Sequence, residues 1–128
     1  MLINGYELVP GADLQGADLS GADIKLKAGA GGIQQLELRD VNLTGANFEK
    51  AKLMNVHFID ANCEGVNFKG ALIQHSSFWK TNLYAANFNK SGVYRTSFFG
   101  ADLTKAMFAE ASLEGFNAGR SNFEMANF

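Results

Sequence analysis

The side chains best suited to metal chemistry are His57 and His75, with Asp60 close to the first of them in the sequence. Imidazole and carboxylate groups bind zinc, but a zinc site needs three or four ligands that converge on one point. The sequence offers only two clear candidates. We therefore predict surface histidines and no metal site.

The single cysteine, Cys63, is the only thiol that could act as a nucleophile. It falls at a position where neighbouring units carry leucine or phenylalanine, so we expect a packed apolar side chain rather than a reactive thiolate. A lone cysteine excludes a disulfide within the chain and fits a reducing compartment, which predicts a cytoplasmic location. No Ser–His–acid or Cys–His arrangement follows from the sequence.

Two glycine-rich segments come close to nucleotide-binding motifs. Residues 115–121 read Gly-Phe-Asn-Ala-Gly-Arg-Ser, one residue short of a phosphate-binding loop and with arginine in place of lysine. Residues 29–32 read Gly-Ala-Gly-Gly, without the third glycine of a dinucleotide-binding fingerprint. Neither motif is complete, so we predict no enzymatic activity and no cofactor.

The elements that place these residues follow from a repeat of five residues. Every fifth residue from Leu38 to Phe128 is apolar, in all nineteen units. The residue two positions earlier is Ala, Ser or Thr in fourteen of the nineteen, and Asn or Asp often lies between the two. A period of five fits neither a helix nor a simple strand. It fits a coil that turns one corner per unit, with one small and one large side chain pointing inward.

Units such as Ala46-Asn47-Phe48 and Ala17-Asp18-Leu19 resemble the A(D/N)LXX consensus of the pentapeptide-repeat family. The resemblance covers residues 10–24 and 36–128. It implies an all-β fold, a right-handed β-helix of square cross-section with four units per coil and about five to six coils. Successive coils would then rise by about 4.8 Å, the spacing of neighbouring strands.

The repeat divides the single expected domain into four segments. Residues 1–11 are not repetitive and are predicted to cap the first coil. Residues 12–24 hold the first units, and residues 38–128 hold the regular ones. Between them, residues 25–37 form a glycine-rich loop or a break in phase, either a deletion in the coil or an insertion that leaves it. In family members that protect DNA gyrase, projecting loops matter for activity, so this segment is a candidate functional feature. A tolerated irregularity is an equally good interpretation.

Residues twenty apart stack in such a coil, which sorts the inward side chains into columns. Phe48, Phe68, Phe88 and Phe108 form one column, and Phe58, Phe78 and Phe98 form the opposite one. Near the end, Phe116 occupies the small position and Ala118 the large one, which we interpret as a volume-conserving exchange. A filled interior leaves no pocket for a substrate.

Short polar residues also stack, as Asn42, Asn62 and Asn82 on one face and Asn47, Asn67 and Asn87 on the next. A catalytic role is conceivable for such groups, but a structural one is favoured. Asparagine side chains hydrogen-bond the local backbone at tight corners and bond one another along a stack.

Outward positions carry an aligned apolar strip. Ile59, Trp79 and Phe99 share one register on successive coils. Aligned exposed aromatic residues are typical of binding sites, so we predict that this strip contacts a protein partner or a second copy. The alternative is that these side chains simply cover a sheet face, or are themselves covered by the loop before Leu38. The predicted strip also includes Met54, Leu72 and Tyr94 on the preceding face and Tyr84 on the following one.

The repeat continues to the last residue of the sequence. A last coil without a cap would expose backbone groups and the core side chains Phe123 and Phe128. We expect either end-to-end association of two copies through this coil or a following segment that covers it. A homodimer through the C-terminal coil or through the aromatic strip is therefore predicted.

Charge and hydropathy limit the function further. The formal net charge of −2 gives no basic surface for nucleic acid, and no apolar run is long enough to span a membrane. The first hypothesis is a non-catalytic interaction or structural module with a protein partner. The alternative, implied by the family resemblance, is a DNA mimic that binds a type II topoisomerase such as DNA gyrase, although acidic and basic residues are interleaved. A structural part of a larger assembly is a third possibility.

Overall fold

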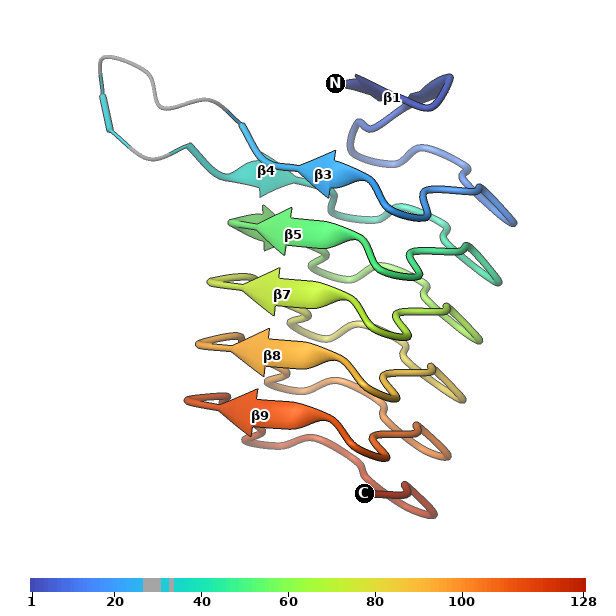
Figure 1. The fold of residues 1–128 in the computed structure, drawn as a ribbon, viewed down its shortest axis with the longest axis vertical. Coiled ribbons are helices and arrows are strands. Elements are labelled where there is room, and N and C mark those ends of the chain that lie inside the picture. The colour runs from blue at the N-terminus through green and yellow to red at the C-terminus, as the bar shows by residue number, and fades with distance from the viewer. Residues whose placement is uncertain (27–30, 33) are drawn as a thin grey trace.

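The computed structural model describes residues 1–26, 31–32 and 34–128 (Figure 1). These residues form nine short strands joined by turns, with no helix among them. The strands are β1 (Leu2–Ile3), β2 (Tyr6–Glu7), β3 (Asp23–Ile24), β4 (Leu36–Glu37), β5 (Lys52–Met54), β6 (Val56–His57), β7 (Leu72–Gln74), β8 (Gly92–Tyr94) and β9 (Ser112–Glu114).

The strands stack in parallel as the chain winds around one axis. The principal sheet has the order β3-β5-β7-β8-β9, and β4 pairs with β6 on the adjoining face. Figure 1 shows the five strands of the principal sheet one above another, with one coil of chain between each pair. The fold is the predicted all-β solenoid. From β3 to β9 it completes about four turns, slightly fewer than the five to six coils predicted, because the units at both ends form incomplete coils.

Pairing distances along the chain define the register of the coils. Leu53 pairs with Ile73, and Ile73 with Val93, twenty residues apart. In the first coil the side chains of Asp13 and Asn42 meet across 29 positions. The first coil is therefore nine residues longer than the later ones. These extra residues leave the coil after β3, and the chain rejoins it at β4. The structure therefore has an insertion here and not a deletion. The predicted loop at 25–37 is described only in part, because residues 27–30 and 33 lie outside the described residues.

The first residues form an antiparallel pair, β1 with β2, at one end of the solenoid. Leu8 follows β2 and is fully buried against the first coil. The positively charged amino terminus of Met1 pairs with Glu7 at 2.9 Å. This hairpin thus lies at the place where the sequence predicted a cap.

Phenylalanine rings fill the interior in two columns. Phe88 stacks on Phe68 at 5.1 Å and on Phe108 at 4.9 Å between ring centroids. It meets Phe78 and Phe98 of the opposite column edge-on. The five side chains therefore pack face to face along the axis and edge to face across it, the two favourable geometries for aromatic rings.

The exchange of small and large residues in the last complete coil is confirmed. Phe116 points into the core from the small position, and its ring lies 6.1 Å from Phe98 in an edge-to-face contact. Ala118 takes the position that Phe98 holds one coil earlier. One ring thus replaces another in the same layer, as the conserved volume requires.

Candidate interaction surface

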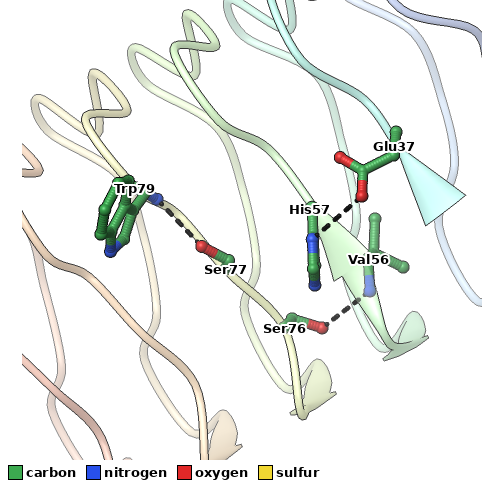
Figure 2. Close-up of polar contacts among 6 residues, drawn as sticks. All are labelled: Glu37, Val56, His57, Ser76, Ser77 and Trp79. Carbon is green, nitrogen blue, oxygen red and sulfur yellow. Dashed lines mark hydrogen bonds and ion pairs between the residues drawn. The ribbon is translucent and has the colours of Figure 1, made fainter. Parts of the chain in front are cut away.

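The two histidines lie in different surroundings. His57 Nδ1 lies 3.2 Å from Glu37 Oε1 of the preceding coil, and both strands are visible in Figure 2. His75 is exposed at a corner with a φ of 51°. The part of the chain that the structure describes has no group of three or more His, Cys, Asp or Glu side chains that could hold a metal ion.

Cys63 is completely buried in the column between Leu43 and Leu83. Burial raises the pKa of its thiol well above the usual range, because the surrounding side chains cannot solvate a thiolate. The residue is therefore a packed apolar side chain, as predicted, and cannot present a nucleophile at the surface.

The stacked asparagines make the hydrogen bonds that their positions predict. Asn67 Nδ2 donates to Asn47 Oδ1 at 3.1 Å, and Asn82 Nδ2 donates to Asn62 Oδ1 at 3.2 Å. Each of these side chains also accepts a bond from the amide two residues later, as Asn67 does from Lys69. The oxygens that could act as bases are thus engaged in turns.

The acidic members of the stacks are held in the same way. Asp18 Oδ1 accepts a bond from the Ser20 amide at 3.1 Å. Hydrogen bonds from the hydroxyl and the amide of Ser20 lower the pKa of the Asp18 carboxyl, because they stabilise its charged form. A carboxylate held in its charged form at a turn suits a structural role better than general acid catalysis.

The predicted aromatic strip is present on the face of the solenoid that follows the principal sheet. Trp79 is the most exposed of its three residues, with 42% of its surface accessible, while Ile59 and Phe99 are half-buried. The Trp79 and Phe99 rings lie 5.1 Å apart, tilted by 31°. We call Ile59, Trp79 and Phe99 the strip.

Turn hydrogen bonds fix the backbone under the strip. The amide of Trp79 donates to Ser77 Oγ at 3.3 Å, as Figure 2 shows, and the amide of Phe99 makes the same bond to Ser97. Each ring therefore projects from a turn of the same kind and points away from the core. These bonds restrain the backbone that carries the two rings.

Glycine and basic residues border the rings. A Cβ atom placed at Gly119 would lie 3.2 Å from Phe99 Cδ2, so the Phe99 ring covers this glycine. The Arg120 guanidinium lies 5.8 Å from the Phe99 centroid, and Lys80 Nζ lies 6.0 Å from the Trp79 centroid. Both cations are within reach of a favourable contact with the ring faces.

The other predicted contact residues lie on the two faces next to the strip. Met54 and Tyr94 are in register in the principal sheet, but Gln74 separates them, and Leu72 is half-buried in the next column of that sheet. Tyr94 covers Gly92, where a Cβ atom would lie 2.8 Å from the tyrosine ring. The sequence left open the alternative that these side chains simply cover a sheet face, and the packing of Tyr94 on Gly92 fits that alternative.

On the following face, Tyr84 is half-buried beneath a lysine. Lys105 Nζ lies 5.5 Å from the Tyr84 centroid. A hydrogen bond with the Tyr84 side chain raises the pKa of Lys105. The tyrosine is thus engaged within the chain and presents less free ring surface than Trp79.

At the last coil, Phe123 is half-buried and Phe128 is 64% exposed. Their ring centroids lie 5.6 Å apart, and Phe128 stacks on Phe108 at 5.0 Å. Both rings therefore continue the core packing, and Phe128 leaves one face open to solvent.

The sequence analysis missed the arrangement of charge beside the strip. One corner of the same face carries Asp40 and Asp60 near one end, and Lys80 and Arg120 toward the other. The amide of Asp60 donates to the Trp79 carbonyl, and the amide of Lys80 donates to the Phe99 carbonyl. These four residues, which we call the charged corner, thus run alongside the strip. The sequence does contain this signal: at positions separated by multiples of twenty, the side-chain charge changes from negative at 40 and 60 to positive at 80 and 120.

A solenoid of five-residue units with a filled interior and an exposed aromatic pair places the chain among the repeat proteins whose coils stack along one axis. The family model described as a pentapeptide repeat region matches residues 31–108. The chain belongs to the pentapeptide-repeat family. Comparison with curated proteins gave no match.

One of the similar solved structures supports the same fold, with a TM-score above 0.5. A pentapeptide-repeat protein from the thylakoid lumen of Arabidopsis thaliana is 28% identical, with a TM-score of 0.64 over 66% of this chain and 59% of its own length. This chain thus spans less than two thirds of that protein. One from the cyanobacterium Cyanothece 51142 is 19% identical over 89% of both chains, with a TM-score of 0.46. QnrB1, a plasmid-mediated fluoroquinolone resistance protein, is 21% identical over 91% of this chain and 70% of its own, with a TM-score of 0.42.

Within the described residues there is no helix of the length and apolar character that crossing a membrane requires.

Proposed function

We propose that this protein is a non-catalytic interaction module whose strip docks on a protein partner. The observation that carries the proposal is Trp79, a large aromatic side chain that is 42% exposed and stacked on Phe99 over a restrained backbone. Tryptophan is the residue type most enriched among those that dominate binding energy at interfaces. Its exposure in the isolated chain leaves apolar surface that a partner would bury.

The rest of the molecule supports binding better than catalysis. The phenylalanine columns fill the interior, so a substrate would have to bind on the outer surface. A surface hollow of about 300 Å³ is lined by Ser20, Gly21, Glu49 and Lys50. It contains neither a histidine nor a cysteine, and its two charged side chains are flexible and partly solvated, so it lacks a positioned acid–base pair.

The alternative of DNA mimicry receives less support from the distribution of charge. A mimic of the DNA backbone needs a continuous acidic surface. Here the rows of asparagine are neutral, and the outward positions of each face carry both signs. Acidic and basic neighbours include Glu49 with Lys69 on one face and Asp60 with Lys80 on another.

The proposal is tested with Trp79→Lys and with Met54→Lys as the matched control. Met54 is an apolar side chain of similar exposure (39%) on the neighbouring sheet. Because Trp79 is the only tryptophan, its emission reports directly on the strip. We expect a partner that binds the unchanged protein to shift the tryptophan emission to shorter wavelength. Trp79→Lys should no longer capture this partner, whereas Met54→Lys should still capture it. Capture that is equal for both variants, with both folded, would contradict the proposal.

A further inference from the structure

The strip and the charged corner together have the pattern of a surface that pairs with its own copy. We infer that two copies of this chain associate face to face through this surface, with their solenoid axes antiparallel. This inference rests on the proposed function, and it names the partner and the orientation.

Two-fold symmetry fixes which residues would meet. Place a two-fold axis in the plane of the interface, perpendicular to the solenoid axis and midway between the coils of Trp79 and Phe99. Such an axis reverses the order of the coils but keeps each corner on its own side. Trp79 then faces the partner's Phe99. Asp60, one and a half coils from the axis, faces the partner's Arg120, which lies equally far on the other side.

The strip would meet its copy as a row of apolar side chains. Ile59 would face the level of the partner's Gly119, which the partner's own Phe99 ring covers, so the contact is between Ile59 and that ring. Gly100 is likewise covered by the Lys80 side chain of its own chain, so the close apolar contact is confined to the strip.

The charges favour the antiparallel orientation over the parallel one. Among the described residues, Asp60 and Arg120 form no ion pair within the chain, so both are available to a partner. In an antiparallel pair the contact between Asp60 and the partner's Arg120 occurs twice. A parallel pair, with its two-fold axis along the solenoid axis, would place the two charged corners at opposite edges of the interface, where neither contact forms.

The size of the face limits the strength of the association. The four levels that overlap in this pair, those of residues 59, 79, 99 and 119, span only about 15 Å along the solenoid axis at about 4.8 Å per coil. Such a short face belongs at the small end of the size range of protein interfaces. We therefore expect a monomer–dimer equilibrium in the micromolar range of concentration rather than a permanent dimer.

The experiment is sedimentation equilibrium over a concentration series for the full chain and five variants. Asp60→Arg and Arg120→Asp should each weaken the dimer about tenfold, because two-fold symmetry places each reversed charge against a like charge twice. The double variant, Asp60→Arg with Arg120→Asp, exchanges the partners and should restore the original dissociation constant. Arginine is tolerated at these corners, since Arg95 and Arg120 already adopt a positive φ there.

Lys69→Glu on the opposite face is the charge-matched control and should leave the dimer unchanged. Thermal melts confirm that each variant is folded. A monomer at all concentrations would overturn the self-association but not the docking of another protein on the strip. A dimer that Trp79→Lys abolishes, but that the charge reversals do not affect, would overturn the antiparallel orientation alone. A dimer that Trp79→Lys leaves intact would overturn self-association through the strip, and would leave the docking of another protein there to its own test.

Discussion

At the scale of single residues, hydroxyl groups complete the backbone hydrogen bonds at one corner of the coil. At most corners the amide of the small inward residue donates to the carbonyl three residues earlier, as Ala61 does to Phe58. At the corner after β5, the Val56 amide instead donates to Ser76 Oγ of the next coil at 3.2 Å (Figure 2). Ser76 Oγ in turn donates to the Gln74 carbonyl. Ser76 is 4% exposed, so water cannot replace these bonds.

The first prediction concerns Ser76→Ala. Alanine is the residue most typical of this position, so the repeat pattern alone would expect the substitution to be harmless. The structure predicts a loss of about 1–3 kcal/mol in the free energy of unfolding, because the buried Val56 amide would have no partner. Urea denaturation measures this loss.

Ser91→Ala is the matched control. Ser91 is equally buried, and its Oγ donates to the Phe88 carbonyl, but that carbonyl also accepts the Ser91 amide. Removal of the Ser91 hydroxyl leaves no amide unpaired, so we expect a loss of about 1 kcal/mol or less in the free energy of unfolding. Equal losses for the two variants would show that the bond to Val56 contributes nothing specific.

At the scale of the repeating unit, every corner turns through a residue with positive φ. From residue 40 to residue 125, each fifth residue adopts this conformation, and thirteen of these eighteen residues are not glycine. The left-handed region is unfavourable for side chains with a Cβ atom by about 1 kcal/mol or more. Close stacking of the coils therefore holds most corners in a conformation that their residues would not choose in isolation.

Ala85→Gly tests this strain. Ala85 has a φ of 56° and no polar group that could compensate for it. Glycine relieves the steric penalty but increases the freedom of the unfolded chain, so we expect a net gain of up to about 1 kcal/mol in stability, measured by thermal unfolding. The control Ala86→Gly lies at a buried inward position of ordinary φ and should lose stability. A loss at both positions would contradict the assignment of strain to the corner.

The five-residue pattern was enough to predict the elements of this fold because each unit satisfies the same packing rule. The apolar position and the small residue beside it determine which side chains point inward, so the burial of Cys63 followed from spacing. The Phe columns followed from the spacing together with the four units per coil that the family resemblance implied. The backbone conformation of the corner residues could not be predicted, because residue types such as Lys50 and Arg95 do not indicate a strained φ. The role of Ser76 was hidden for the same reason, since serine also counts as a small residue.

The candidate surface was predictable only along its own column. The alignment of Ile59, Trp79 and Phe99 followed from the twenty-residue period. Whether a neighbouring aromatic side chain is free depends on what it covers, which spacing does not specify. Tyr94 lies over Gly92, and its sequence position gave no indication of this contact.

At the scale of the whole molecule, each coil packs only on the coils directly above and below it. Phe88 illustrates this, because it stacks on Phe68 and Phe108 and touches the intervening rings of the opposite column. In such a linear stack, stability is approximately a sum over coils and over the interfaces between them. A defect in the middle therefore weakens two interfaces, whereas a defect at the last ring weakens one.

This arrangement predicts that the cost of removing a phenylalanine depends on its position along the axis. Phe88→Ala should lose about 3–5 kcal/mol, because Phe88 is fully buried and the cavity would separate two well-packed halves. Phe128→Ala should lose clearly less, because Phe128 is 64% exposed and stacks on one ring of its column only. Hydrogen exchange resolves the effect along the chain: Phe88→Ala should reduce amide protection in the coils on both sides of residue 88, and Phe128→Ala only near the last coil. Uniform loss of protection in both variants would indicate instead that the solenoid unfolds as a single cooperative unit.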